Sequence, residues 1–214
     1  MSLSPLAQLL SRKRLLIFDL DGTLVDSSPL HARAFEETFA PHGVSVDYNA
    51  IAGMTTAAAV DKLAAGLALG EAERSRLVGE KRDRALRMLE TELSAIEGAV
   101  DFVRAARSRF ALALCTSASR RGAETSLARV GLDGCFDPVI TAEDVTRGKP
   151  DPEPFLKALF AHDAPPAEAL VFEDADSGLA AAAAAGIDAV RIVQAPDGDG
   201  IRWAPLLRAL EALA

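Results

Sequence analysis

Five short runs of apolar residues recur along the chain, and each ends at a turn or at the start of a helix. They cover Arg14–Phe18, Phe110–Cys115, Pro138–Thr141, Ala169–Phe172 and Ala189–Val193. Apolar and polar residues do not alternate within these runs, a pattern typical of parallel strands that are covered on both faces. The runs therefore predict five buried parallel strands.

Helical patterns separate most of these runs. Apolar residues at helical spacing, proline near a start and glycine at an end predict helices over Gly98–Arg109, Arg121–Gly131, Asp151–Ala161 and Ser177–Ala185, and a final amphipathic one over Pro205–Leu213 after a loop at Ala195–Gly200. Alternating strands and helices predict an α/β fold in which a doubly wound parallel sheet forms a Rossmann-like core.

One interval breaks this alternation. Roughly eighty residues lie between the first strand and Gly98, although a crossover needs only about a dozen. Three helical patterns fill it, over 28–42, Thr56–Leu69 and Glu71–Leu93. We therefore expect residues 27–94 to form an inserted all-helical cap domain, with residues 1–26 and 95–214 forming the catalytic core.

Composition narrows the class of protein. The chain has 214 residues, of which 50% are hydrophobic, and a net charge of −8. Such apolar content excludes a disordered chain, and two cysteines are too few for a disulfide framework. Cys115 lies in an apolar run, which is typical of a buried reduced thiol. The acidic balance argues against a nucleic-acid partner, which needs clustered Lys and Arg.

The order of residues near the N-terminus bears on localisation. Arg12-Lys13-Arg14 follows an apolar run rather than preceding it, which is the wrong order for a secretory signal. The mostly alanine tract Leu179–Ile187 is far shorter than the ~20 residues a membrane span needs. We expect a cytoplasmic protein without a membrane partner, as a monomer or weak homodimer.

Chemistry-bearing residues follow four of the predicted strands. Asp19 and Asp21 follow the first, the hydroxyl cluster Thr116–Ser119 the second, Lys149 the third, and Glu173-Asp174 the fourth. Ligands of open α/β sheets bind beyond the carboxyl ends of strands. Carboxylates there suit a hard cation, while hydroxyls, amides at a helix start and a lysine suit phosphate. The four strand ends together indicate phosphoryl transfer.

These residues occur in motifs that resemble those of the haloacid dehalogenase superfamily. The four matches, in order, are Asp19-Leu20-Asp21-Gly22-Thr23, Ser117, Lys149 in Gly-Lys-Pro, and Glu173-Asp174. The resemblance runs from Leu15 to about Val193. The inserted helices are similar to the helical cap of the subfamily that contains phosphoglycolate phosphatase and β-phosphoglucomutase.

The resemblance implies a covalent mechanism with Mg²⁺ as cofactor. Asp19 would attack phosphorus and become an aspartyl phosphate, and Asp21 would act as general acid and then as general base. The metal would be held by Asp19, the backbone carbonyl of Asp21 and Asp174, with Glu173 behind these ligands.

The same resemblance assigns the phosphoryl oxygens to Ser117 and Lys149, with backbone amides such as that of Ala118 as further donors. Thr116 remains an alternative to Ser117 as the hydroxyl. The dehalogenases lack the second aspartate, so Asp21 favours phosphate chemistry over dehalogenation.

The substrate is less well defined. His31 stands where the mutase and several sugar phosphatases of this subfamily have a histidine near the active site, and Lys81 aligns with a lysine in the cap of the mutase. We consider both as substrate contacts. However, Ala52 and Thr56 stand where the mutase carries a lysine and an arginine for its second phosphate. We therefore favour a phosphatase acting on a small phosphorylated metabolite, with a sugar phosphate as the preferred class. A sugar-phosphate mutase and a catalytically silent binding protein are the alternatives.

Overall fold

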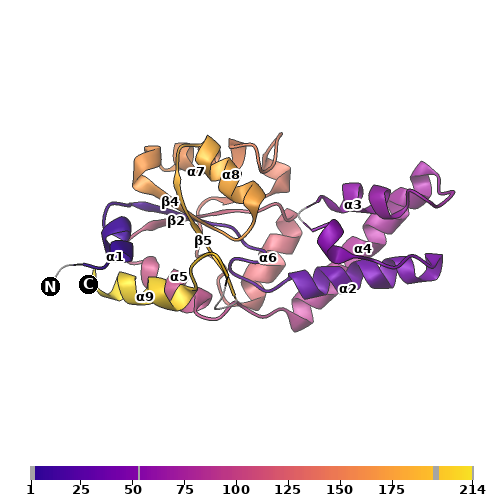
Figure 1. Ribbon diagram of the computed structural model, residues 1–214, viewed down its shortest axis with the longest axis horizontal. Helices are drawn as coiled ribbons and strands as arrows, with labels where there is room; N and C mark the ends of the chain where they lie inside the picture. Colours follow the sequence, from indigo (N-terminus) through magenta and orange to yellow (C-terminus); the bar gives the residue numbers. More distant parts are fainter. Residues whose placement is uncertain (1–2, 53, 195–197, 214) are drawn as a thin grey trace. The chain divides into compact units, whose positions relative to one another are not determined.

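The computed structural model describes residues 3–52, 54–194 and 198–213 (Figure 1). The chain divides into two compact units: Met1–Asp26 with Ser94–Ala214, and Ser27–Leu93. The second unit begins at residue 27, the expected start, and ends at Leu93, one residue before the expected end. Positions 195–197 of the expected Ala195–Gly200 loop lie outside the described residues.

A five-stranded parallel sheet forms the centre of the first unit, with the order β3-β2-β1-β4-β5. The strands are β1 (Leu15–Phe18), β2 (Ala111–Cys115), β3 (Val139–Ile140), β4 (Ala169–Glu173) and β5 (Asp188–Arg191). β1 is buried along its whole length between β2 and β4. The predicted sheet is confirmed, except that edge strand β5 exposes its first two residues.

Helices and short turns complete the first unit. They are α1 (Pro5–Leu10), α5 (Ala99–Ala106), α6 (Arg120–Arg129), the 3-10 turn η3 (Ala142–Asp144), α7 (Glu153–Ala161), the 3-10 turn η4 (Pro166–Glu168), α8 (Asp176–Ala184) and α9 (Trp203–Glu211). The helix α1 was not expected from the sequence. The sequence Ser4-Pro5 is a helix-start signal that could have indicated it. In the structure the Ser4 hydroxyl accepts the amide N–H of Ala7 at 3.2 Å and so caps the helix.

Helices cover both faces of the sheet, as a doubly wound fold requires (Figure 1). Residues Leu15 and Ile17 of β1 lie in one apolar cluster with Phe155 of α7 and Ala181 of α8. The intervening Phe18 points to the opposite face, where its ring packs against α5 and α9. The core therefore lies on both sides of β1 and supports the residues that follow it.

Helices and 3-10 turns are the only regular secondary structure among the described residues of the second unit. It consists of α2 (Ser28–Phe39), the 3-10 turns η1 (Ala40–His42) and η2 (Tyr48–Ala50), α3 (Thr56–Leu63) and α4 (Glu71–Glu92). Its core joins α2, α3 and α4 through Phe35, Phe39, Val60 and Leu77. The predicted fold class, an α/β core with an inserted all-helical domain, is confirmed.

The helix predicted over Thr56–Leu69 is wrong in its second half, because α3 ends at Leu63. The later leucines Leu67 and Leu69 still pack on the core of the insert. The chain turns here instead of continuing the helix, because the amide N–H of Leu67 donates to the carbonyl of Ala64 at 3.0 Å and that of Leu69 donates to the carbonyl of Leu67 at 2.8 Å. These turns let both partly buried leucines reach the core.

The chain leaves and re-enters the first unit at one place. Val25 and Ala95 form an antiparallel bridge, and the amide N–H groups of Asp26 and Ile96 donate to Ser94 and Leu24 at 3.0 and 2.9 Å. This pairing brings the ends of the insert together, so the sheet tolerates an inserted domain directly after β1. Among the described residues, no helix has the length and apolarity needed to cross a membrane.

Candidate active site

The centre of the candidate site is Asp19, the first residue after β1. Its amide N–H donates to the carbonyl of Phe172 at 3.0 Å, which continues the pairing of β1 with β4 beyond the last paired residue. Its carboxylate is buried. The central position of β1 in the sheet therefore places Asp19 between the ends of β2 and β4.

Lys149 lies on the loop that follows β3 and η3, and its ammonium group joins two carboxylates. Lys149 Nζ is 2.6 Å from Asp19 Oδ1 and 2.7 Å from Glu173 Oε1, and all three side chains are at least nine-tenths buried. The ammonium group also lies 5.3 Å from the centre of the Phe155 ring. Three residues that are far apart in the sequence thus form one buried ionic group.

Burial and neighbouring charges shift the pKa values in this group. Burial raises the pKa of Asp19 well above its usual range; Lys149 opposes this rise, while Glu173 and Asp174 add to it. Burial by itself would lower the pKa of Lys149, but the charges of Asp19 and Glu173 raise it above its usual range. Lys149 is therefore a permanent cation that stabilises the ionised form of Asp19.

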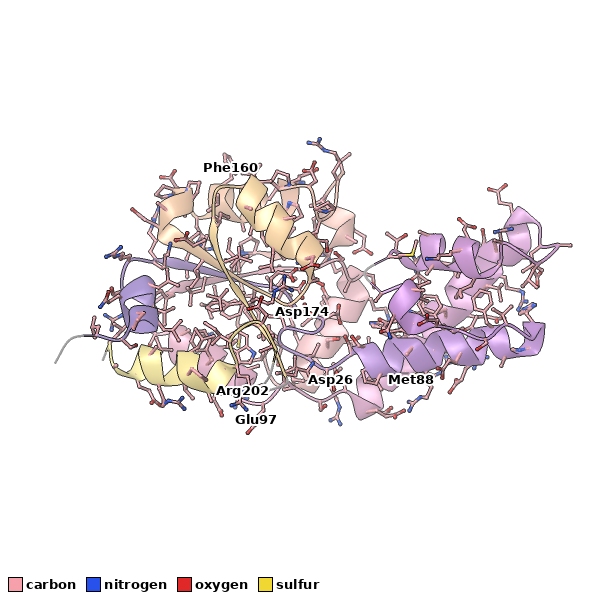
Figure 2. All side chains as sticks on the ribbon, in the orientation of Figure 1. Asp26, Met88, Glu97, Phe160, Asp174 and Arg202 are labelled. Carbon is pink, nitrogen blue, oxygen red and sulfur yellow. The ribbon has the colours of Figure 1, made fainter. Side chains whose placement is uncertain are left out.

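Asp174 directly follows β4 and is labelled in Figure 2. Its Oδ1 accepts a hydrogen bond from Thr23 Oγ1 at 3.2 Å. Burial, together with the charge of Glu173, raises the pKa of Asp174 to about 6. A Cβ at position 22 would lie 2.2 Å from Asp174 Oδ2, and Gly22 has a φ of +87°. Only glycine allows this approach of the turn to the carboxylate.

The acidic cluster, Asp19, Glu173 and Asp174, fits a divalent cation. One oxygen from each carboxylate lies within 4.8 Å of the others. Three ionised carboxylates and one lysine leave a formal charge of −2, and hard cations such as Mg²⁺ prefer oxygen ligands. Burial is the main cause of the raised pKa values of Asp19 and Asp174, and the neighbouring carboxylates add to it. The residues present therefore match the metal expected from the sequence.

Glu173 has both carboxylate oxygens engaged within the protein. Oε1 accepts from Lys149, and Oε2 accepts the amide N–H of Ala175 at 2.7 Å. A Cβ at position 178, in the first turn of α8, would lie 1.7 Å from Glu173 Oε1. Gly178 therefore gives the carboxylate its room. The structure places Glu173 as a support for Lys149 rather than as an open ligand.

The hydroxyl loop, Thr116–Ser119, follows β2. Thr116 is buried, and its Oγ1 accepts the amide N–H of Ala118 at 3.0 Å. Ser117 is exposed, and Ser119 caps α6 by accepting the amide N–H of Gly122 at 3.2 Å. Ser117 is thus the more accessible of the two candidate hydroxyls. The expected amide donor of Ala118 is engaged with Thr116 in this structure.

A network from the end of β3 supports the hydroxyl loop. The amide N–H of Ala142 donates to the carbonyl of Ala118 at 3.0 Å, and that of Arg120 donates to Glu143 at 2.6 Å. Asp144 accepts from the backbone amide and the hydroxyl of Thr141 at 2.8 and 2.7 Å. Sequence reasoning missed these residues. Only the acidic pair that follows Thr141 and Ala142 could have indicated them, as a helix-capping signal.

Asp21 lies half-buried on the turn after β1, where it forms a bridge with Val25. This turn is tightly bonded, since the amide N–H groups of Leu24 and Val25 both donate to the carbonyl of Leu20 at 2.9 and 3.1 Å. Asp19 and Asp21 therefore emerge from the same short segment, with the second aspartate on a rigid turn.

The other two candidates, His31 and Lys81, belong to α2 and α4 of the insert. Lys81 is buried, and its Nζ lies 3.1 Å from His31 Nδ1 and 4.4 Å from the centre of the Phe35 ring. Two polar groups expected from separate parts of the sequence thus form one pair. A lysine is seldom buried in this way, and its charge here lies over an aromatic ring.

The expectation of a buried reduced thiol is confirmed for Cys115, and neither cysteine forms a disulfide. Cys115 is fully buried and its Sγ lies 3.4 Å from the carbonyl oxygen of Pro154. Burial raises the pKa of this thiol to about 12. Cys115 is therefore unreactive at neutral pH, although it precedes the hydroxyl loop.

Comparison with known proteins agrees with the motifs. A family model described as haloacid dehalogenase-like hydrolase matches residues 13–186. The fructose-1-phosphate phosphatase YqaB of Escherichia coli K12 is 35% identical over 83% of this chain and 95% of its own. The validoxylamine A 7'-phosphate phosphatase of Streptomyces hygroscopicus subsp. limoneus is 33% identical over 89% of this chain and 91% of its own.

Among solved structures, CbbY from Rhodobacter sphaeroides in complex with phosphate is similar to this chain. The TM-score is 0.75 at 26% identity, and the match covers 87% of this chain and 90% of CbbY. The similarity therefore extends over both the α/β core and the helical insert.

Proposed function

We propose that this chain, which belongs to the haloacid dehalogenase-like hydrolase family, is a Mg²⁺-dependent phosphomonoesterase that acts on a phosphorylated carbohydrate. The observation that carries the proposal is the buried ionic group in which Lys149 Nζ lies 2.6 Å from Oδ1 of Asp19, a member of the acidic cluster. A lone buried carboxylate would take up a proton, but this one has a permanent cation as partner.

In the first proposed step, a carboxylate oxygen of Asp19 attacks phosphorus and forms an aspartyl phosphate. The bond between phosphorus and the ester oxygen breaks, and Asp21 donates its proton to the leaving alkoxide. In the second step a water attacks phosphorus, Asp21 accepts the proton of that water, and the acyl phosphate bond breaks. Inorganic phosphate leaves and Asp19 is regenerated.

Ser117 and Lys149 are proposed to hold the phosphoryl oxygens through both steps. Ser117 is exposed at the end of β2, and Lys149 carries its charge beside Asp19. Ala118 could add its amide N–H only by giving up its bond to Thr116 Oγ1. We therefore assign the main phosphate contacts to the two side chains.

Asp19, Asp174 and the backbone carbonyl of Asp21 would hold Mg²⁺, with Glu173 supporting Lys149. When bound, this cation supplies positive charge that offsets the negative charge on the phosphoryl group. The −2 formal charge of the acidic cluster with its lysine supports this choice of cofactor.

The substrate class follows from the relatives. Two of them are named as phosphatases of fructose 1-phosphate and validoxylamine A 7'-phosphate, both of which are phosphorylated polyhydroxylated rings or chains. We propose that residues 27–94 act as the cap that selects such a substrate, with His31 and Lys81 as contacts. The proposal places the enzyme in the cytoplasm, where phosphorylated metabolites are made and used.

The test is phosphate release from a panel of sugar phosphates by the wild type, Asp19→Asn and Asp101→Asn. Asp101 is exposed in the first turn of α5 and serves as the matched control. We expect magnesium-dependent release by the wild type and the control, and no release by Asp19→Asn or after chelation. Unchanged turnover in Asp19→Asn would refute the mechanism, and silence of the wild type across the panel would refute the function.

A sugar-phosphate mutase is the second candidate, favoured by the contact between His31 and Lys81. Against it, Ala52 and Thr56 offer no cation for the second phosphate of a bisphosphate intermediate. A coupled assay for conversion of glucose 1-phosphate to glucose 6-phosphate distinguishes the two. Free phosphate without isomerised sugar would exclude the mutase, and any magnesium-dependent turnover would exclude a silent binding protein.

A further inference from the structure

The β1 turn, Leu20–Val25, is bonded to a side chain from the far end of the chain. The indole Nε1 of Trp203, the first residue of α9, donates to the backbone carbonyl of Thr23 at 3.0 Å. Trp203 is fully buried, and the bond between the two groups is buried as well. A buried carbonyl that loses a hydrogen-bond donor is costly, so this bond favours one position of the turn.

The same indole packs beneath the two strand ends that carry the carboxylates. Its ring lies 6.0 Å from that of Phe18, which precedes Asp19, and 5.2 Å from that of Phe172, which precedes Glu173. The two phenylalanine rings are themselves 5.0 Å apart. Trp203 therefore contacts both strands one residue before the acidic cluster.

Thr23 connects the indole to the third carboxylate. Its carbonyl accepts from Trp203, while its hydroxyl donates to Asp174 Oδ1 at 3.2 Å. The backbone also makes room for the indole, because a Cβ at Gly98, where φ is +81°, would lie 3.1 Å from the Cβ of Trp203. The turn thus has one bond on each side, to α9 and to the acidic cluster.

We propose that Trp203 is a positioning residue for the reaction. Through its contacts with Thr23, Phe18 and Phe172 it fixes the position of the β1 turn relative to the acidic cluster. The inference rests on the proposed function of Asp19 and Asp21. It extends that function to α9, the last helix of the chain.

The test compares Trp203→Phe with Phe102→Leu by hydrogen exchange of the metal-free full chain. Phe102 of α5 lies in the same ring cluster, 5.0 Å from the Trp203 ring, but its side chain has no donor for the turn. We expect amides of the β1 turn to exchange about tenfold faster in Trp203→Phe than in the wild type. In Phe102→Leu these amides should exchange near the wild-type rate, even though the two variants lose equal stability. Equal exchange of the turn in both variants would overturn the proposal.

A second variant removes the N–H group without changing the shape of the ring. The chain has a single tryptophan, so biosynthetic replacement by benzothienylalanine changes position 203 alone. Faster exchange of the β1 turn in this protein is expected, and wild-type exchange would contradict the role of the bond. This readout remains decisive if Trp203→Phe folds poorly.

Steady-state kinetics supply an independent readout. For a substrate found with the wild type, Trp203→Phe should lower kcat about tenfold with little change in KM, since misplaced reacting groups slow the chemical step more than binding. If the wild type hydrolyses no phosphate ester, the proposed function fails while the exchange comparison still decides the positioning role of Trp203.

Discussion

Charged side chains in the α/β unit and in the helical insert find their partners in different ways. In the α/β unit, Lys149 reaches buried carboxylates 130 and 24 positions away in the sequence. In the insert, Arg76 of α4 pairs with Glu73 and Glu80, three and four positions away on the same helix, and the three side chains are between 39% and 49% exposed. One group depends on the whole fold, and the other only on the helix.

This difference indicates where charge serves chemistry. Burying ions costs more than exposing them, so a buried ionic group seldom adds to stability over an apolar one of the same shape. Exposed pairs one helical turn apart cost and contribute little. The acidic cluster with Lys149 therefore stands out as a site kept for its reactivity, whereas the charges of α4 keep the insert solvated.

The largest effect should come from Lys149→Met. The substitution leaves Asp19 and Glu173 without their cation, and breaking a buried pair in this way costs about 3–5 kcal/mol. The free energy of unfolding, measured in urea without metal, should fall by that amount. Lys157→Met, which removes a half-exposed lysine of α7 paired with Glu153, is the control and should change little.

The loss in Lys149→Met should also depend on pH. Burial already raises the pKa of Asp19, and removal of Lys149 would raise it further above the unfolded value of about 3.9. A carboxyl with such a raised pKa destabilises the folded state increasingly as the pH rises toward that pKa. The loss should be larger at about pH 8 than at about pH 5, and a loss independent of pH would contradict this account.

A smaller effect of opposite sign in the two regions is expected for glycine-to-alanine substitutions. In Gly178→Ala the new Cβ meets Glu173 Oε1, which must leave Lys149, at a cost of about 1–3 kcal/mol. In Gly79→Ala, within α4, the new Cβ meets no atom within 4 Å and should add about 0.5–1 kcal/mol through helix propensity. Urea unfolding measures whether the free energy of unfolding falls in Gly178→Ala and rises in Gly79→Ala. Stabilisation by Gly178→Ala would show that Glu173 has room to move.

The sequence predicted the fold and the strand-end residues because both follow from local patterns. The five apolar runs correspond to the five strands. Asp19 and Asp174 directly follow β1 and β4, and Lys149 lies on the loop after β3. Parallel strands then bring their carboxyl ends to one edge, so the assembly of the acidic cluster needed no further information. Confirmation of the family supports the same reading of the motifs.

What the sequence could not predict depends on contacts between distant segments. The need for glycine at position 178 comes from a side chain that reaches it from β4, and the bond from Trp203 to Thr23 spans 180 positions. The early end of α3 is a similar case, because burial of Leu67 and Leu69 on the insert core overrides a pattern that looked helical. Local propensity is a weak prior against such packing.

A pH-dependent metal affinity would sharpen the contrast between the two kinds of charge. In the metal-free protein the pKa of Asp174 is raised to about 6, so below that pH a proton must leave before the carboxylate can bind Mg²⁺. The proton on Asp174 should then lower the apparent affinity by up to about tenfold for each unit of pH below about 6. Calorimetric titration with Mg²⁺ at several pH values measures this. An affinity that does not change between about pH 5 and about pH 7 would exclude Asp174 as a ligand with this pKa.

The smallest effect is expected for Arg76→Ala on α4. The two ion pairs of Arg76 do not depend on the tertiary fold, because its partners Glu73 and Glu80 lie on its own helix. Water reaches all three side chains. Its charge lowers the pKa of Glu73 through a hydrogen bond, yet such exposed pairs seldom contribute measurably. Alanine also favours the helix at least as well as arginine. Thermal unfolding should therefore give the wild-type midpoint at low and at high salt. A clear loss of stability that salt abolishes would show that local ion pairs hold the insert together, and the contrast between the two regions would then be one of distance along the chain rather than of energy.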